Sequence, residues 1–367
     1  MAKQKVIKNN KFKNALKIGA AALCAAAIVA IVIITGRQNA DKAEKTLNTT
    51  VMGTTASITV YGRNGSDIID DIMDLENDLD EKVISWRADG SEVWNINHSY
   101  KAGEDYQISD ELADVLKRTL EISEDNGDLL DITIRPLAEV WGIESGSTNV
   151  PSQTDIDAAL SDVDVTQVTC IPAKNSSDGK SYVNIAREGM SLDFGAVGKG
   201  YGCDVAADYL EETSVTGACV ALGGSIMVYG SKPDELDWKI GVKDPRAGEG
   251  SIMGVISAKG GETLFVSTSG DYEKYFEKDG KRYHHILDPK SGYPVWKHTI
   301  AATVVCDNGL LSDALSTLCM LLDRESAMEV VSRYGAEVIL IDDQMNVYVS
   351  DGLKDRFTLS ESTYSLK

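Results

Sequence analysis

The feature that most constrains the fold is the stretch from Ser191 to Asp204, which reads S-L-D-F-G-A-V-G-K-G-Y-G-C-D and contains four glycines. The residues Met190 to Phe194 predict the end of a buried strand, the glycines predict a tight turn, and a helix is expected to begin near Lys199. Such a turn lets backbone N–H groups approach an anion closely, and the helix N-terminus adds partial positive charge. The stretch therefore predicts a cradle for a phosphate or nucleotide, with a tight strand-to-helix connection and a surface lysine as the alternative.

An uncharged segment of 19 residues, 18–36, lies between Lys17 and Arg37, and the residues before it include six lysines and no acid. As a helix at ~1.5 Å per residue it spans roughly 28 Å, close to the ~30 Å hydrocarbon thickness of a membrane. The lysines predict that residues 1–17 are a cytoplasmic tail and that the bulk of a single-pass cell-membrane protein lies outside the cytoplasm. A cleaved signal peptide and a lipoprotein modified at Cys24 are the alternatives.

The net charge of the chain is −21, which argues against nucleic acid as a partner. Beyond the apolar segment the cysteines show no C-x-x-C pair and no zinc spacing. We expect them to be buried free thiols rather than a disulfide framework. These are Cys170, Cys203, Cys219, Cys306 and Cys319.

Strands and helices mix without regular alternation after the apolar segment, which predicts an α+β fold rather than a doubly wound sheet. No internal repeat is visible. We expect a linker over residues 37–48, one domain over residues 49–350 and a C-terminal tail over residues 351–367.

Several local patterns predict where elements begin and end. The β-branched run from Val51 to Tyr61 is typical of a strand, and Gly223-Gly224 between two apolar runs is typical of a hairpin. Hydroxyl side chains ahead of helical patterns predict N-caps at Ser109, Thr154 and Ser312.

Asp313 and Thr317 are four residues apart on the helix that Ser312 is expected to cap, so they share one face. Carboxylate and hydroxyl oxygens suit a hard cation such as Mg²⁺, which keeps several waters and substrate phosphates as its other ligands. The alternative is that Asp313 complements the helix dipole and that Thr317 is bonded to the backbone.

Two of the four histidines, His284 and His285, are adjacent in a strand-like segment and therefore point to opposite faces. One of them is expected to face a site. A histidine beside a bound phosphoanhydride can accept a proton from an incoming hydroxyl or hydrogen-bond a ligand.

Nine motifs together resemble the ApbE family in order and approximate spacing, over about residues 48–345. They are M-G-T (52–54), I-S-W-x-x-x-G-S-E (84–92), D-I-T-I-x-P-L-x-x-x-W-G (131–142), L-D-F-G-A-V-G-K-G-Y-x-x-D (192–204), L-G-G-S-I (222–226), G-V-x-D-P (241–245), T-S-G-D-Y (268–272), H-I-L-D-P-x-S-G-x-P (285–294) and D-A-L-S-T (313–317). The resemblance implies a two-lobed, T-fold-like domain of mixed sheet and helix, which here would follow a transmembrane helix.

The resemblance also implies an activity, that of an FAD:protein FMN transferase. FAD would bind between the lobes with Mg²⁺ on its pyrophosphate. A Thr or Ser hydroxyl of an extracytoplasmic acceptor protein, in a site of the type D-G-x-(S/T)-G-(A/S)-T, would attack the FMN phosphorus, and AMP would leave.

Carried over motif by motif, the resemblance implies three groups of site residues. Those expected to contact FAD are Met52, Trp86, Leu130, Asp131, Asp193, Lys199 and Leu287. Those expected to hold the metal are Asp313, Thr317 and the backbone carbonyl at Ala196. His285 is expected to act as base or to orient the substrate, and Asp313 to be essential for catalysis.

Two departures from the family pattern bear on these expectations. Many relatives carry tyrosine where this chain has Trp86, and some carry a second acid where it has Ser316. An aromatic ring is retained, but the metal shell would depend more on water. An Mg²⁺-dependent FAD pyrophosphatase that yields FMN and AMP, and a non-catalytic FAD-binding protein, are the alternative functions.

Overall fold

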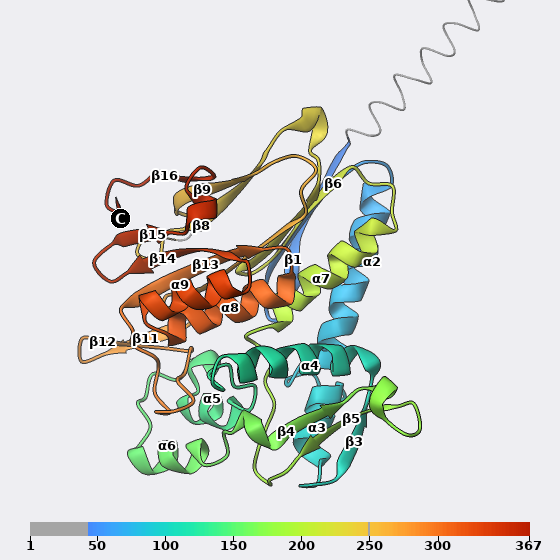
Figure 1. Ribbon diagram of the computed structural model, residues 1–367, viewed down its shortest axis with the longest axis vertical. Helices are drawn as coiled ribbons and strands as arrows, with labels where there is room; N and C mark the ends of the chain where they lie inside the picture. Colours follow the sequence, from blue (N-terminus) through green and yellow to red (C-terminus); the bar gives the residue numbers. More distant parts are fainter. Residues whose placement is uncertain (1–42, 249) are drawn as a thin grey trace, which may run out of the picture.

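The protein is described here from a computed structural model, which places residues 43–248 and 250–367. Within this part of the chain the largest element is a nine-stranded sheet (Figure 1). Neighbouring strands pair antiparallel except for the last two, which are parallel. In spatial order the strands are β1 (Glu44–Val51), β2 (Thr54–Tyr61), β6 (Gly217–Leu222), β7 (Ser225–Gly230), β10 (Leu264–Gly270), β13 (Thr299–Cys306), β14 (Glu337–Asp342), β15 (Asn346–Val349) and β17 (Ser365–Leu366).

The first two strands correct two expectations from the sequence. The single strand predicted from Val51 to Tyr61 is in fact a hairpin, because Met52 and Gly53 both adopt positive φ and turn the chain. The linker predicted over residues 37–48 is wrong for residues 44–48, which belong to β1 and pair with β2. The strand is polar because it lies at the sheet edge and is largely exposed, so its composition resembles that of a linker.

The two faces of the sheet bury different partners because side chains alternate along each strand. On β13, Ala302 and Val304 pack with the helices, whereas Ala301 and Val305 pack in the cluster of the second sheet. The helices on the first face are α2 (Gly65–Asp78), α7 (Gly198–Glu211), α8 (Gly309–Leu321) and α9 (Arg324–Arg333). The second sheet is β16 (Phe357–Leu359), β9 (Ile252–Ala258) and β8 (Trp238–Lys243).

The segment expected to be a C-terminal tail, residues 351–367, is part of the folded domain. Phe357 and Tyr364 are buried in the core beneath the second sheet, and the segment supplies β16 and β17. Both strands are short, and the apolar residues that anchor them are widely spaced. The composition of the segment therefore resembles that of an unstructured tail.

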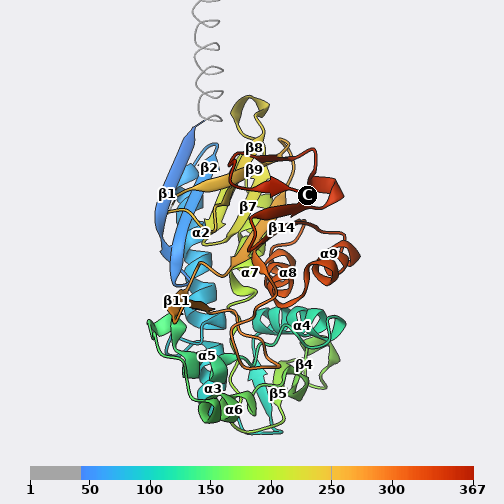
Figure 2. The same ribbon diagram turned by 90° about the vertical axis from the view of Figure 1, so that its left-hand side faces the viewer.

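A second lobe, residues 79–197, is inserted between α2 and α7 and is called the insert lobe; the remainder of the described chain is the sheet lobe (Figures 1 and 2). A π-helix, Leu79–Ile84, continues α2 into the insert lobe. The elements of the insert lobe are α3 (Glu92–Ser99), β3 (Asp105–Ile108), α4 (Asp110–Asp125), α5 (Arg135–Trp141), α6 (Gln153–Leu160), β4 (Val168–Ile171) and β5 (Ser181–Ile185).

A hairpin of the sheet lobe, β11 (Tyr275–Lys278) and β12 (Lys281–His284), lies at the junction of the two lobes. The segment after it packs on the insert lobe, where the Trp141 indole N–H donates to the Gly292 carbonyl at 2.8 Å. Short 3₁₀ turns complete the described elements, at Ile143–Ser145, Val165–Gln167, Ala173–Asn175, Pro233–Glu235 and Asp351–Leu353.

Among the predicted N-caps, Ser109 is confirmed because its hydroxyl accepts the Leu112 N–H at 3.1 Å. The other two are wrong. Ser152 caps α6 in place of Thr154, and Asn308 caps α8 in place of Ser312, whose hydroxyl instead donates to the Gly309 carbonyl. In each case a competing polar residue lies two to four positions upstream and begins the helix earlier.

The predicted α+β class is confirmed. The anchor expected at residues 18–36 and the cytoplasmic tail at residues 1–17 lie outside the described residues. Within residues 43–248 and 250–367, we find no helix with the length and apolar character needed to cross a membrane.

Candidate functional site

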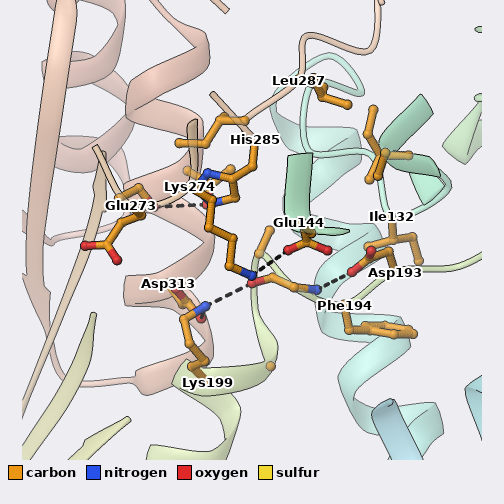
Figure 3. Close-up of a pocket in the computed structure, with 18 of the residues that line it drawn as sticks. Ile132, Glu144, Asp193, Phe194, Lys199, Glu273, Lys274, His285, Leu287 and Asp313 are labelled. Atoms are coloured by element: carbon orange, nitrogen blue, oxygen red, sulfur yellow. Dashed lines mark hydrogen bonds and ion pairs between the residues drawn. The ribbon is translucent and has the colours of Figure 1, made fainter. Parts of the chain in front are cut away.

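A cavity of about 270 Å³ lies between the two lobes (Figure 3). All the residues that the family resemblance assigns to the site line it, although they come from segments spread along most of the chain. They are Met52, Trp86, Leu130, Asp131, Asp193, Ala196, Lys199, His285, Leu287, Asp313 and Thr317. The structure thus brings the set together, and the role of each residue stays a prediction.

The glycine-rich stretch forms one wall of the cavity. The strand predicted over Met190–Phe194 is wrong: the described chain forms only an isolated bridge there, between Ser191 and Ile134. Beside this bridge the Asp193 N–H donates to the Ile132 carbonyl at 2.7 Å, and the Leu192 N–H donates to a side chain, the Asn97 Oδ1, at 2.7 Å. The turn follows, and in it the Gly195 N–H donates to the Asp193 carboxylate at 2.8 Å. Helix α7 then begins at Gly198, as expected.

Two glycines bring α7 and α8 unusually close together. A Cβ added to Gly200 would lie 2.1 Å from the Gly309 carbonyl oxygen, and one added to Gly309 would lie 2.1 Å from that of Gly200. The Gly200 N–H therefore reaches across to the Asp313 Oδ2 at 3.0 Å. This crossing places Lys199 of α7 directly beside Asp313 of α8.

The ammonium group of Lys199 lies among the oxygens at this end of the cavity. The Lys199 Nζ donates to the Gly195 carbonyl at 2.9 Å and lies 3.3 Å from the Asp313 Oδ2. The Thr317 hydroxyl is 3.3 Å from the Ser269 Oγ and adds another oxygen to the same wall. These groups form a cation-binding set of oxygens.

The donor set fits Mg²⁺ better than a softer metal. No cluster of three or more His, Cys, Asp or Glu residues able to hold a metal occurs in the described chain. One carboxylate, one hydroxyl and backbone carbonyls would leave the remaining positions of a hard cation to water and substrate oxygens. Asp313, Thr317 and the turn at Ala196 are the residues that would hold it.

The two adjacent histidines face opposite ways, as predicted. His284 is buried and its Nε2 lies 2.9 Å from the Val295 carbonyl, whereas His285 lines the cavity. The His285 Nδ1 has no hydrogen-bond partner among the described residues. Burial, together with the neighbouring charges of Lys274 and Lys199, lowers the pKa of His285 to about 4, against the opposing effect of Glu144. His285 is therefore neutral near pH 7 and its Nδ1 can accept a proton or hydrogen bond.

We expect the His285 imidazole to titrate with a pKa of about 4, below the 6.5 of an ordinary histidine. Between these values the unfolded chain binds a proton that the folded chain does not, so His285 makes the free energy of unfolding rise with pH. Histidine-selective NMR can follow the four imidazoles, with His285→Gln assigning the signal. A midpoint near 6.5 would contradict the burial that we describe.

Trp86 presents its ring to two guanidinium groups. The Arg135 guanidinium carbon lies 3.2 Å from the ring centroid and that of Arg87 lies 4.1 Å away. Arg135 is also 3.9 Å from the Asp193 carboxylate. Burial, and then the nearby Glu144 carboxylate, raise the pKa of Asp193. Arginine side chains thus lie beside both Trp86 and Asp193, two of the residues predicted to contact FAD.

Asp131 directs its carboxylate into the insert lobe. It accepts the Thr133 N–H at 2.7 Å, the Thr133 hydroxyl at 2.5 Å and the Val165 N–H at 3.0 Å. The side chain therefore holds the loop that carries the buried Leu130 against the cavity.

Among the charged residues around the cavity that the sequence motifs do not single out are Arg87, Arg135, Glu144 and Lys274. Each lies within three residues of a motif residue, but only the structure shows that they converge. Glu144 accepts from the Lys274 Nζ at 2.8 Å and from the Arg87 Nη2 at 3.1 Å. Burial raises the pKa of Glu144, and the cations, with Lys274 foremost, outweigh it and lower that pKa overall.

Comparison with known proteins agrees with this architecture. The model of the ApbE family matches residues 52–340. An FAD:protein FMN transferase of Escherichia coli (strain K12) is 29% identical over 289 residues, which cover 77% of this chain and 80% of the relative. Another, from Klebsiella pneumoniae (strain 342), is 31% identical over 293 residues, which cover 78% and 86%.

Solved structures are similar over nearly their whole length. The ApbE protein of Thermotoga maritima aligns with a TM-score of 0.76 and 29% identity, covering 86% of this chain and 99% of the other. The apo form of the flavinyl transferase ApbE of Pseudomonas stutzeri aligns with a TM-score of 0.73 and 26% identity, covering 87% and 98%.

The two-lobed α+β fold and the cavity between the lobes thus place the protein in the structural class of the flavinyl transferases. The chain belongs to the ApbE family. The family that the motifs indicated is confirmed, and with it the expectation of an enzyme.

Proposed function

We propose that this protein transfers FMN from FAD to a Thr or Ser hydroxyl of an acceptor protein, in an Mg²⁺-dependent reaction that releases AMP. The observation that carries the proposal is the end of the cavity where Lys199, Asp313 and the glycine-rich turn meet. Phosphoryl transfer chiefly requires positioning and charge neutralisation, and these groups supply both.

The charge of the cavity supports the need for a divalent cation. Among the described residues its lining includes the acidic side chains of Asp80, Glu144, Asp193, Glu273 and Asp313, besides Asp131, whose carboxylate is bonded within the insert lobe. The same lining has three cationic side chains, from Arg87, Lys199 and Lys274. A pyrophosphate entering this surface would be repelled without an added positive charge. Mg²⁺ held at Asp313 and Thr317 would neutralise the pyrophosphate and polarise its phosphorus–oxygen bonds.

The proposed step conserves atoms and charge. The acceptor hydroxyl oxygen forms a bond to the FMN phosphorus while the phosphoanhydride bond to the adenylate breaks, and AMP leaves with the bonding electron pair. The hydroxyl proton passes to the neutral His285, whose Nδ1 is unpartnered in the described structure, and then to solvent. Lys199 holds the wall of the site in place by bridging Gly195 and Asp313.

We further propose that the reaction takes place outside the cytoplasm on an acceptor with a site of the type D-G-x-(S/T)-G-(A/S)-T. The uncharged segment 18–36, preceded by six lysines, supports this location as a membrane anchor. Fractionation of cells, followed by protease treatment from the outer side, tests the orientation. Protection of the enzymatic domain in intact cells, with cleavage only after lysis, would contradict it.

The activity is tested by incubating the full chain in detergent with FAD, MgCl₂ and an acceptor domain that carries this site. Intact-protein mass spectrometry should show the acceptor heavier by one FMN minus water, and AMP should appear in equal amount. AMP and free FMN formed without acceptor would identify a pyrophosphatase instead. FAD binding with no product under either condition would identify a binding protein.

Replacing Lys199 with alanine should weaken FAD binding by roughly 1.5–3 kcal/mol, because a charge-assisted contact close to the pyrophosphate is lost. Flavin fluorescence titration measures the dissociation constant. Lys239→Ala, which removes a lysine 57% exposed on β8, is the matched control and should leave binding unchanged. An unchanged FAD dissociation constant for Lys199→Ala would show that this lysine does not contribute to FAD binding.

A further inference from the structure

One ion-pair network links the two lobes across the cavity. Glu144 lies in the 3₁₀ turn Ile143–Ser145 of the insert lobe, and Lys274 follows β10 in the sheet lobe. Figure 3 shows the Lys274 side chain reaching across to Glu144, where the Nζ–Oε1 distance is 2.8 Å. The other Glu144 oxygen accepts from Arg87 at 3.1 Å. A single carboxylate thus holds two cations that line the cavity.

The network contributes little to joining the lobes. The Lys274 and Arg87 side chains are 43% and 44% exposed, and ion pairs of that exposure stabilise a fold only weakly. Buried contacts already connect the lobes, because Leu287 packs in one cluster with Leu137 and the Trp141 indole bonds to Gly292. The arrangement is therefore better explained by what the two cations can bind.

A carboxylate and a phosphate offer the same kind of oxygens to a guanidinium and an ammonium group. In this structure Lys199 is engaged by Asp313 and Gly195 at one side of the cavity. Arg87 and Lys274 are the remaining cations of the described lining, and both are directed to Glu144. An anion that entered between them would compete with the Glu144 carboxylate for both cations.

We propose that Arg87 and Lys274 form a second phosphate subsite, which Glu144 occupies until the nucleotide enters. The inference rests on the proposed function, because the phosphate is that of FAD or of the AMP produced from it. Glu144 acts as a built-in competitor that weakens the hold of the site on phosphate-bearing ligands. This competition favours release of AMP after transfer.

The test uses the full chain in detergent, with a chelator and without acceptor, and measures binding of FAD, AMP and riboflavin by calorimetry. Glu144→Gln should lower the dissociation constants of FAD and AMP on the order of fivefold, because the competing charge is removed. Lys274→Ala should raise both constants by about tenfold, and Lys274→Arg should largely restore them. Riboflavin has no phosphate and should bind equally to all variants.

Glu121→Gln is the control, because it removes the partner of Lys117 in an ion pair of 2.7 Å on α4, outside the cavity. An unchanged or weaker affinity for AMP in Glu144→Gln, or an equal change for riboflavin, would overturn the proposal. If Glu144→Gln fails to fold, the comparison of Lys274→Ala with Lys274→Arg decides it. Transfer itself is measured separately by acceptor mass, so loss of that activity leaves this result intact.

Discussion

Asp313→Asn should lower the rate of FMN transfer on the order of a thousandfold, while the protein remains folded. The carboxylate is buried, accepts the Gly200 N–H at 3.0 Å and lies 3.3 Å from the Lys199 Nζ. An amide oxygen can still accept the backbone N–H, so the helix crossing survives. The negative charge that holds Lys199 and the proposed cation is lost, and a catalytic metal contributes several kcal/mol to a transition state of this kind.

The measurement is the initial rate of acceptor flavinylation over a series of MgCl₂ concentrations, with circular dichroism as the check on folding. Asp307→Asn, an exposed acid just before α8, is the matched control and should keep full activity. A variant at position 313 with near-normal rate and unaltered magnesium dependence would remove Asp313 from the metal site.

Gly200→Ala should be the most destabilising of these substitutions. The added Cβ would lie 2.1 Å from the Gly309 carbonyl oxygen and 2.7 Å from the Asp313 Cβ, so α7 and α8 must move apart. Overpacking of this severity costs about 3 kcal/mol or more, which exceeds the ~1 kcal/mol that alanine gains over glycine within a helix. The same displacement separates Lys199 from Asp313, and FAD binding should weaken in parallel.

Urea unfolding followed by fluorescence gives the change in the free energy of unfolding. Gly248→Ala makes the same chemical change at an exposed position where the new methyl group meets no atom within 4 Å, and it should be neutral. Equal stability of the two variants would show that the helices can separate at no cost, against the close crossing described above.

The residues predicted for the site line one cavity, and part of this arrangement is local to a short segment. The turn from Asp193 to Lys199 places a carboxylate, carbonyls and an ammonium group within seven residues, so its character is visible in the sequence. The pairing of this turn with Asp313 could be expected only through the family resemblance. The structure shows what allows this pairing: Gly200 and Gly309 have no side chains, so α7 and α8 approach closely enough for the contact.

Other features depend on contacts between distant segments and leave no local pattern. Glu144 and Lys274 are 130 residues apart and meet only because the lobes face each other. The strands at the two edges of the large sheet, β1 and β17, are polar or very short and resemble linker and tail. Their partners, rather than their composition, make them strands.

The insertion of one lobe into the other has a mechanical consequence. Within the described chain the backbone passes between the lobes twice, through the π-helix Leu79–Ile84 and through the turn before Gly198. The two passages touch, since a Cβ on Gly198 would lie 2.9 Å from the Ile84 Cδ1. Residues of both passages also line the cavity. A nucleotide bound there would therefore lie against both backbone connections between the lobes.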